Sequence, residues 1–276
     1  MTANHKFFLH LAFQIAEKNL GKTGLNPSVG SIVVNNDTVI SSGVTSINGR
    51  PHAEFNALNK VKNTAGSTLY TSLEPCVHRG KTPPCTDIII KKKIKNVFFG
   101  LEDPDRRTFK KAKKILNANG IKTKLIRTKK YNNFYRSYII NKKFKIPFIS
   151  AKIAISKDYF TINKNDKWIT NNFSRKITHL IRSQHDGIIS TSKSINYDNA
   201  LLNCRIEGLN EFKPDLFIVD LNLKLKKNLL LNKILKKRKT YLITYKTNAK
   251  KAQVFKKKGY KIIFINSLIN QDDFNL

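Results

Sequence analysis

Residues with the chemistry of metal ligands gather in two short stretches of the first third of the chain. Residues 51–58 read PHAEFNAL, so His52 stands two positions before Glu54. Residues 72–85 read SLEPCVHRGKTPPC, in which Cys76 and Cys85 each follow a proline and enclose eight residues. One imidazole and two thiolates are donors that zinc prefers. Three protein ligands with one open position are typical of a catalytic zinc, because a structural zinc closes with a fourth ligand.

The same two cysteines could also form a disulfide, or be buried thiols that are close by chance. Polar residues interrupt the apolar stretch of the N-terminus, MTANHKFFLHLAFQIAEKNL, and no small-residue cleavage site follows it. We therefore expect a cytoplasmic protein, and in a reducing compartment close cysteines are more often metal ligands or catalytic groups than disulfides. A helix start is expected at each ligand stretch, and the helix dipole there favours thiolate over thiol.

The order of these residues along the chain indicates one class of zinc enzyme. A glutamate beside the histidine that is not itself a ligand can take a proton from water and deliver it to a leaving amine. The pattern H-x-E alone is weak, since a lone histidine near apolar residues is more often a buried core side chain. The pattern H-x-E followed by P-C and a second cysteine is that of the zinc nucleobase deaminases.

The loop between the two cysteines favours a phosphorylated small molecule as the substrate. Deaminases of free cytidine, DNA or RNA typically carry two residues at this place, whereas this chain carries eight. The loop offers a ring-edge donor in His78, a close-approach glycine in Gly80, a cation in Lys81 and a hydroxyl in Thr82. An unpaired nucleic-acid strand would call for an aromatic stacking platform, and this loop has no aromatic residue.

The charge of the chain has two readings. It has 276 residues, with 52 Lys and Arg against 18 Asp and Glu, which gives a formal net charge of +34. A strongly basic surface attracts phosphate, so a nucleic-acid-binding protein with a structural zinc is one alternative. Compositional bias is the reading we favour, because Lys, Asn and Ile are abundant and the lysines are scattered over the whole chain. We expect no nucleic-acid partner and, with no long apolar run, no membrane segment.

The hydrophobic pattern predicts two α/β domains. In the first, strands and helices alternate, with a helix over 4–20, a hairpin over 31–43, helices that begin near 52, 84 and 107, and strands over 67–73, 95–100 and 121–126. A polar connecting helix follows, and we place the boundary near residue 144, which gives domains 1–144 and 145–276. The second domain is expected to begin with a strand over 148–156 and to alternate again, with helices near 172–184, 229–238 and 249–258.

The stretches NPSVG, PHAE and EPCVHRGKTPPC closely resemble the deaminase domain of the bifunctional riboflavin-biosynthesis deaminase/reductase family. The resemblance implies a cytidine-deaminase-like three-layer domain. Its reaction would convert 2,5-diamino-6-(5-phosphoribosylamino)pyrimidin-4-one to 5-amino-6-(5-phosphoribosylamino)uracil. It assigns zinc to His52, Cys76 and Cys85, the acid/base role to Glu54, and substrate contacts to Asn26, His78, Lys81 and Thr82. Thr45 stands where that family usually has a histidine, which puts one substrate contact in doubt.

The second domain resembles the same family at AKIAISKDYF, DKWIT and IRSQHDGIISTSKSINYDNALLNCR. The resemblance implies a dihydrofolate-reductase-like α/β domain that uses NADPH to reduce the ribosyl group to a ribityl chain. It places Ala154, Trp168, Ser194 and Asp198 at NADPH, and Asp166, Arg182, Leu202 and Arg205 at the substrate. Several matched positions are altered: Tyr159 and Phe160 replace Gly-Arg, and Asp166 replaces a serine that would meet a phosphate.

Members of that family continue for several dozen residues past the point that matches the last residues of this sequence, and that stretch carries a glycine-rich E-G-G motif for the cofactor's phosphates. We therefore expect an incomplete, truncated reductase-like domain, and two alternatives stay open: an NADPH-dependent reductase, or a non-catalytic scaffold beside a working deaminase. A deaminase that acts on another pyrimidine or on a nucleic-acid base is a further alternative. The expected partner is a phosphorylated pyrimidine, and we expect a homo-oligomer. Cys204 is expected to be a small buried apolar residue.

Overall fold

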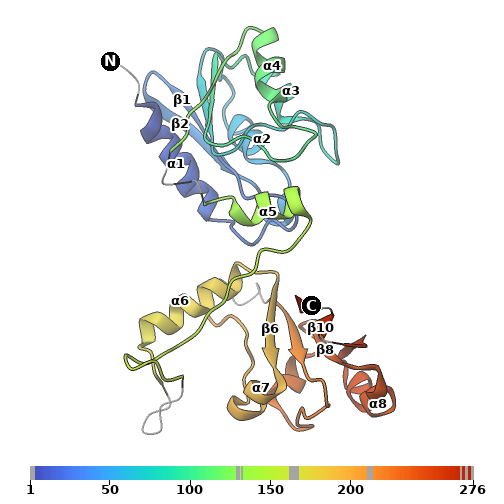
Figure 1. Ribbon diagram of the computed structural model, residues 1–276. Helices are drawn as coiled ribbons and strands as arrows, with labels where there is room; N and C mark the ends of the chain where they lie inside the picture. The colour runs from blue at the N-terminus through green and yellow to red at the C-terminus, as the bar shows by residue number, and fades with distance from the viewer. Residues whose placement is uncertain are drawn as a thin grey trace. The chain divides into compact units, whose positions relative to one another are not determined.

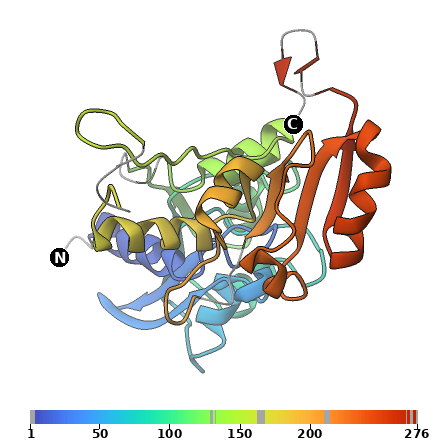
Figure 2. The same cartoon turned by 90° about the horizontal axis from the view of Figure 1, so that it is seen from below.

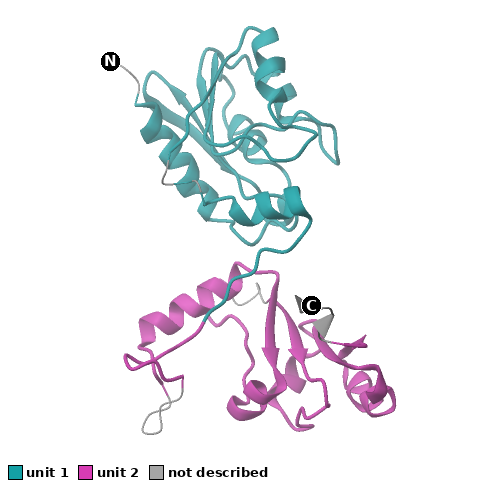
Figure 3. Ribbon diagram, viewed as in Figure 1, with its two compact units in different colours: residues 1–152 teal, residues 153–276 magenta. Residues whose placement is uncertain are grey.

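The chain folds into two compact units, Met1–Lys152 and Ile153–Leu276 (Figure 3). The computed structural model describes residues 4–128, 131, 133–161, 168–209, 214–267, 269–270 and 273–274. No described helix is long and apolar enough to cross a membrane. The two units divide between Lys152 and Ile153, whereas the sequence pattern predicts a boundary near residue 144.

Unit 1 is built on a five-stranded mixed sheet with the order β2-β1-β3-β4-β5. β1 (Gly30–Asn35) pairs antiparallel with β2 (Thr38–Val44) and with β3 (Thr68–Thr71). β4 (Asn96–Phe99) and β5 (Lys122–Leu125) extend the sheet in parallel. The predicted hairpin is confirmed, and Asn36 and Asp37 form its turn with positive φ angles of 46° and 58°, which Asn and Asp tolerate better than other side chains.

Helices cover both faces of this sheet, so unit 1 has three layers (Figure 1). α1 (His5–Glu17) packs on the face to which Ile32 and Val34 point. The other face, to which Val33 points, is covered by α2 (Ala53–Leu58), α3 (Cys85–Lys91) and α4 (Lys111–Ala118). The alternation of side chains along a strand thus divides one apolar run between two cores. α5 (Arg136–Phe144) is the predicted connecting helix.

α2 lies directly against β2 because Gly43 has no side chain. A Cβ atom at Gly43 would lie 2.3 Å from the carbonyl oxygen of Ala53 and 2.4 Å from the backbone nitrogen of Ala57. Any other residue at this position would push α2 away from the sheet. The contact matters for the site, since the first turn of α2 carries Glu54 and His52 precedes it.

Unit 2 contains a four-stranded parallel sheet with the order β6-β7-β8-β9. The strands are β6 (Gly187–Thr191), β7 (Asp215–Val219), β8 (Thr240–Tyr245) and β9 (Lys261–Ile265). Figure 2 shows α8 (Ala249–Lys258) along one face of these strands. The core on this side contains Leu216, Ile218, Leu242 and Phe255. α6 (Asn172–Ser183) and α7 (Ser192–Asp198) flank β6 in sequence, and β10 (Ile269–Asn270) pairs with β11 (Asp273–Phe274).

Two predicted elements of unit 2 are wrong. The sequence pattern predicts a strand over residues 148–156, but the described chain has no strand there, and Ile149 and Ile153 are 75% and 70% exposed. An apolar alternation forms a strand only where a neighbouring strand supplies hydrogen bonds. The helix predicted near 229–238 is a short 3-10 helix at Leu230–Ile234, and α7 is an element that the sequence analysis did not predict.

Candidate metal centre and active site

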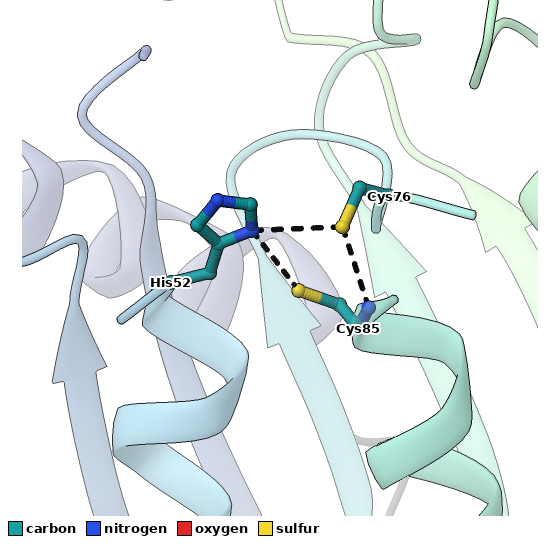
Figure 4. Close-up of side chains that lie close together, drawn as sticks. All are labelled: His52, Cys76 and Cys85. Atoms are coloured by element: carbon teal, nitrogen blue, oxygen red, sulfur yellow. Dashed lines mark hydrogen bonds between the residues drawn. The ribbon is translucent and has the colours of Figure 1, made fainter. Parts of the chain in front are cut away.

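Three elements of unit 1 bring His52, Cys76 and Cys85 together (Figure 4). His52 is the N-cap of α2, Cys85 is the first residue of α3, and Cys76 lies in the loop after β3. The Nδ1 atom of His52 lies 3.3 Å from the Sγ atom of Cys85 and 3.5 Å from that of Cys76. All three donor atoms lie within 4.8 Å of one another.

These donors fit a zinc ion. Tetrahedral zinc with ordinary Zn–S and Zn–N bond lengths holds its nitrogen and sulfur ligands about 3.5 Å apart. The two nitrogen–sulfur distances, 3.3 and 3.5 Å, are close to that separation. One imidazole and two thiols, with no fourth protein donor in the cluster that the described residues form, leave one position for water or substrate.

The surroundings of Cys76 favour its thiolate form. The backbone N–H of Cys85 donates to the Sγ atom of Cys76 over 3.3 Å. Interactions with the Cys85 thiol and with His52 lower the pKa of Cys76 to about 4 despite its burial. The Cys76 thiolate and burial together raise the pKa of Cys85 well above its usual value. Two sulfur atoms this close cannot both carry a charge unless a cation lies between them, which again fits a metal site.

Glu54 lies beside the ligands. Its side chain comes from the first turn of α2, the residue is 3% exposed, and its Oε2 atom lies 3.4 Å from the Cys85 Sγ atom. Burial raises the pKa of Glu54 to about 7. A carboxyl group with a pKa near the operating pH is suited to take up and release a proton.

A cavity opens in front of the metal ligands. Of the predicted deaminase residues, Asn26, His52, Glu54, Cys76 and His78 line it, and Thr45 does too. Lys81 and Thr82, both described, lie outside its wall, and Lys81 is exposed. The cavity wall also contains residues that the sequence analysis did not predict: Arg50, Glu74, Asp103, Asp105, Arg107, Tyr138 and Lys142.

Three of these additional residues are acidic: Glu74 follows β3, and Asp103 and Asp105 follow β4. The carboxylate of Glu74 accepts hydrogen bonds from the backbone N–H groups of Asp103, Lys110 and Ala112, over 3.2, 3.1 and 3.1 Å. These bonds fix the loop between β4 and α4. Burial raises the pKa of Asp103 to about 6. The stretch LEDPD directly after a parallel strand is the signal that could have shown these carboxylates, because sites form at the carboxyl ends of such strands.

The helix α5 closes this side of the cavity. The Tyr138 hydroxyl donates to Asp103 over 3.1 Å, and the Lys142 Nζ atom lies 3.0 Å from Asp105. Arg107 also pairs with Asp105, over 2.7 Å. The Arg107 hydrogen bonds, followed by Lys142, hold the pKa of Asp105 well below its usual range. The cations Arg107 and Lys142 therefore share the single carboxylate of Asp105.

In unit 2 the structure brings some of the predicted reductase residues together. Arg182 donates to the carbonyl oxygen of Asn203 over 3.3 Å, and Arg205 donates to the Asn203 side chain over 2.9 Å. Burial, followed by the charge of Arg205, lowers the pKa of Arg182. Leu202 lies in the same loop with a positive φ of 49°. Cys204, also in this loop, is 1% exposed, which confirms it as a small buried residue.

The predicted NADPH residues lie on separate segments. Ser194 and Asp198 are exposed on α7, which follows β6. Trp168 is 50% exposed and lies against the Arg175 guanidinium, 4.5 Å from the ring centroid, and Ala154 lies in a segment without helix or strand. Asp166 lies outside the described residues.

Comparison with known proteins decides the family. The model of the cytidine and deoxycytidylate deaminase zinc-binding region matches residues 2–101, and that of the RibD C-terminal domain matches residues 147–272. The riboflavin biosynthesis protein RibD of Aquifex aeolicus is 33% identical over 269 residues, which cover 94% of this chain and 73% of that protein. This chain belongs to the RibD family. RibD of Buchnera aphidicola is 36% identical over 214 residues, which cover 74% of this chain and 56% of that protein.

Solved RibD structures share the fold of the chain. One crystal form of Acinetobacter baumannii RibD is 25% identical, with a TM-score of 0.81, over 96% of this chain and 74% of that one. The deaminase/reductase of Thermotoga maritima is 25% identical, with a TM-score of 0.76, over 95% of this chain and 80% of that one. The predicted fold class is therefore confirmed: a cytidine-deaminase-like domain followed by a RibD-type α/β domain. The matched zinc-binding region includes all three clustered ligands.

Proposed function

We propose that this RibD-family chain is a zinc-dependent hydrolytic deaminase of riboflavin biosynthesis that releases ammonia from the diaminopyrimidinone phosphate. The observation that carries the proposal is the cluster of His52, Cys76 and Cys85 beside the buried carboxylate of Glu54. A zinc that only stabilises the fold needs no proton carrier beside its ligands. A buried carboxylate at that place has a purpose in hydrolysis.

Each group of residues in the site has a separate role in the deamination. Zinc held by His52, Cys76 and Cys85 would supply Lewis-acid activation of water. Glu54 accepts a proton from the attacking water and then delivers it to the amine, so that the leaving group departs as ammonia. Asn26 and His78 in the cavity wall orient the pyrimidine ring. Lys81 and Thr82, from the loop between the cysteines, contact the phosphate end of the substrate.

The buried Asp103 would also contact the pyrimidine ring of the substrate. At neutral pH a carboxylate in this wall can accept hydrogen bonds from ring N–H or amino groups of the pyrimidine. Its raised pKa reflects the free energy of keeping such a group out of water, and a bound ring with several N–H groups would offset part of it.

For unit 2 we propose the family's second step, the NADPH-dependent reduction of the ribosyl group. Ser194 and Asp198 lie on the helix after β6, at the carboxyl end of a parallel sheet, where open α/β sheets bind nucleotides. This position fits a dinucleotide, and Ala154 and Trp168 would complete its contacts. Arg182, Leu202 and Arg205, which meet around Asn203, would bind the anionic substrate. We assign the deaminase to residues 1–144 and the reductase to residues 145–276.

We also propose that the protein works in the cytoplasm as a homo-oligomer. Large apolar side chains of α6 support self-association, because Phe173 and Ile177 are 71% and 40% exposed. Light scattering of the purified protein measures this directly, and a monomer at micromolar concentration would contradict it.

The deaminase proposal is tested by ammonia release from zinc-loaded protein. The diaminopyrimidinone phosphate, cytidine and single-stranded DNA are supplied separately under the same conditions. We expect ammonia from the first substrate only. Turnover of cytidine or DNA in preference to the phosphate would mean that the deaminase acts on another base.

A further inference from the structure

Arg50 reaches into the deaminase cavity from the segment before α2, and neither the motifs nor the deaminase chemistry assigns it a role. The residue is half-buried and lines the same cavity as His52, Glu54 and Asn26. Its Nη1 atom donates to the hydroxyl of Thr82 in the loop between the two cysteines. A Cβ atom at Gly80 would come within 3.3 Å of its Nη2 atom, so the loop lies closely over the guanidinium.

Arg50 does not serve to orient the metal ligand. The Nδ1 atom of His52 faces both sulfur atoms, so Nε2 is the nitrogen that carries a hydrogen when Nδ1 binds a metal. The Nη1 atom of Arg50 lies 3.4 Å from that Nε2 atom. Metal-binding histidines usually donate this second N–H to an acceptor, but a guanidinium has only donors. The 3.4 Å contact is a hydrogen bond only while Nε2 carries no hydrogen, and it is lost when Nδ1 binds a metal and Nε2 becomes a donor.

Among the described residues, Arg50 also has no salt-bridge partner. Arg107 and Lys142, the other long cations of the cavity wall, both pair with Asp105. Within the described part of the chain, no carboxylate forms a salt bridge with Arg50. A half-buried guanidinium that meets an N–H group and no anion is unfavourable in the free protein. An anion that enters the cavity would supply the missing partner.

We propose that Arg50 binds the phosphate of the substrate and makes the deaminase specific for phosphorylated pyrimidines. This inference rests on the deaminase function proposed above and adds a residue to it. The planar fork of a guanidinium matches two phosphate oxygens, and Thr82 engages only one of its five N–H donors. The Thr82 hydroxyl, held at the guanidinium, is placed to donate to the same phosphate. Lys81 is exposed outside the cavity wall, so it would contact the phosphate from the solvent side, whereas Arg50 would contact it from inside the cavity.

The test compares three variants of the zinc-loaded full chain. Arg50→Gln removes the charge and the fork, and Arg50→Lys keeps the charge alone. Arg79→Gln is the matched control, because Arg79 is an exposed cation in the same loop outside the cavity wall. Zinc content and thermal unfolding confirm that each variant is folded and loaded.

The first readout is binding of ribose 5-phosphate and of ribose, measured by calorimetry. We expect Arg50→Gln to weaken binding of ribose 5-phosphate about 10- to 100-fold, which is the usual effect of losing charge-assisted hydrogen bonds. Binding of ribose should be unchanged, Arg50→Lys should lie between, and Arg79→Gln should match the unaltered protein. Equal binding of ribose 5-phosphate by Arg50→Gln and the unaltered protein would overturn the proposal. An equal loss in Arg79→Gln would also overturn it, since the effect would then come from the general positive field.

The second readout is the kinetics of ammonia release. Arg50→Gln should raise KM for the phosphorylated substrate by the same factor, and it should leave the slow turnover of the dephosphorylated substrate unchanged. A loss that is equal for both substrates would show that Arg50 supports the metal site instead. If the unaltered protein releases no ammonia, the deaminase function fails, while the calorimetric comparison still decides the role of Arg50.

Discussion

The substitution Glu54→Gln separates proton transfer from metal binding. It keeps the size of a side chain that is 3% exposed and packed against Cys85, but it removes the group that carries the proton. A positioned acid/base contributes about 100- to 10,000-fold to a rate. This corresponds to about 3 to 5 kcal/mol of transition-state stabilisation. We expect kcat for ammonia release to fall by that factor, with KM and zinc content unchanged, because His52, Cys76 and Cys85 supply the metal donors.

The assay combines ammonia release with elemental analysis of the same protein sample. Glu102→Gln is the control, because Glu102 pairs with Arg127 at the surface and its loss should leave kcat unaltered. If Glu54→Gln retained its zinc and kept its rate within tenfold of the unaltered protein, Glu54 would not be the proton carrier. If it lost its zinc, the carboxylate would belong to the metal site, and the division of roles would be wrong.

Three further substitutions test the surroundings of the site. Cys85→Ala should abolish zinc binding and ammonia release and lower the melting temperature, because the ligand also anchors α3, as elemental analysis and thermal unfolding can measure. Glu74→Gln should lower the free energy of unfolding by about 1 to 3 kcal/mol in urea, because an amide nitrogen would face a backbone N–H that the carboxylate now accepts. Asp105→Asn should destabilise the protein at pH 7. The depressed pKa of Asp105 stabilises the fold above about pH 4 and loses that effect as pH falls further, so the difference in melting temperature should shrink in acid.

Each of these has an outcome that would contradict it. Zinc bound with full stoichiometry by Cys85→Ala would show that another donor replaces the thiolate. For Glu74, unfolding in urea identical to that of the surface variant Glu102→Gln would mean that its three backbone hydrogen bonds add nothing. A melting-temperature difference for Asp105→Asn that stays constant from pH 7 to pH 3 would exclude ionisation of Asp105 as its cause.

The metal ligands could be predicted from the sequence because their signal is local. His52 and Glu54 share one short stretch, and Cys76 and Cys85 share another, so the residue types and spacing carry the chemistry. The elements that position them also follow local rules. The Asn36–Asp37 turn specifies the hairpin, and alternating apolar residues specify the strands.

The stretch LEDPD could have indicated Asp103 and Asp105, but their contacts could not be predicted, because these contacts join distant parts of the chain. Asp103 meets Tyr138, and Asp105 meets Lys142, only after α5 has returned to the sheet. The position of Arg50 in the site could not be predicted for the same reason, since its partner Thr82 lies in another loop. The strand predicted at residues 148–156 is wrong because an apolar alternation is a local pattern and does not show whether a neighbouring strand is available for pairing.

The most direct measurement follows one reaction in two ways. Purified, zinc-loaded protein is mixed with the diaminopyrimidinone phosphate and NADPH, and ammonia release and NADPH absorbance are recorded together. We expect ammonia release that depends on zinc, followed by loss of NADPH absorbance. Ammonia without NADPH oxidation would keep the deaminase and leave unit 2 as a non-catalytic scaffold. Absence of ammonia from folded, zinc-loaded protein would contradict the central claim that His52, Cys76, Cys85 and Glu54 form a deaminase site.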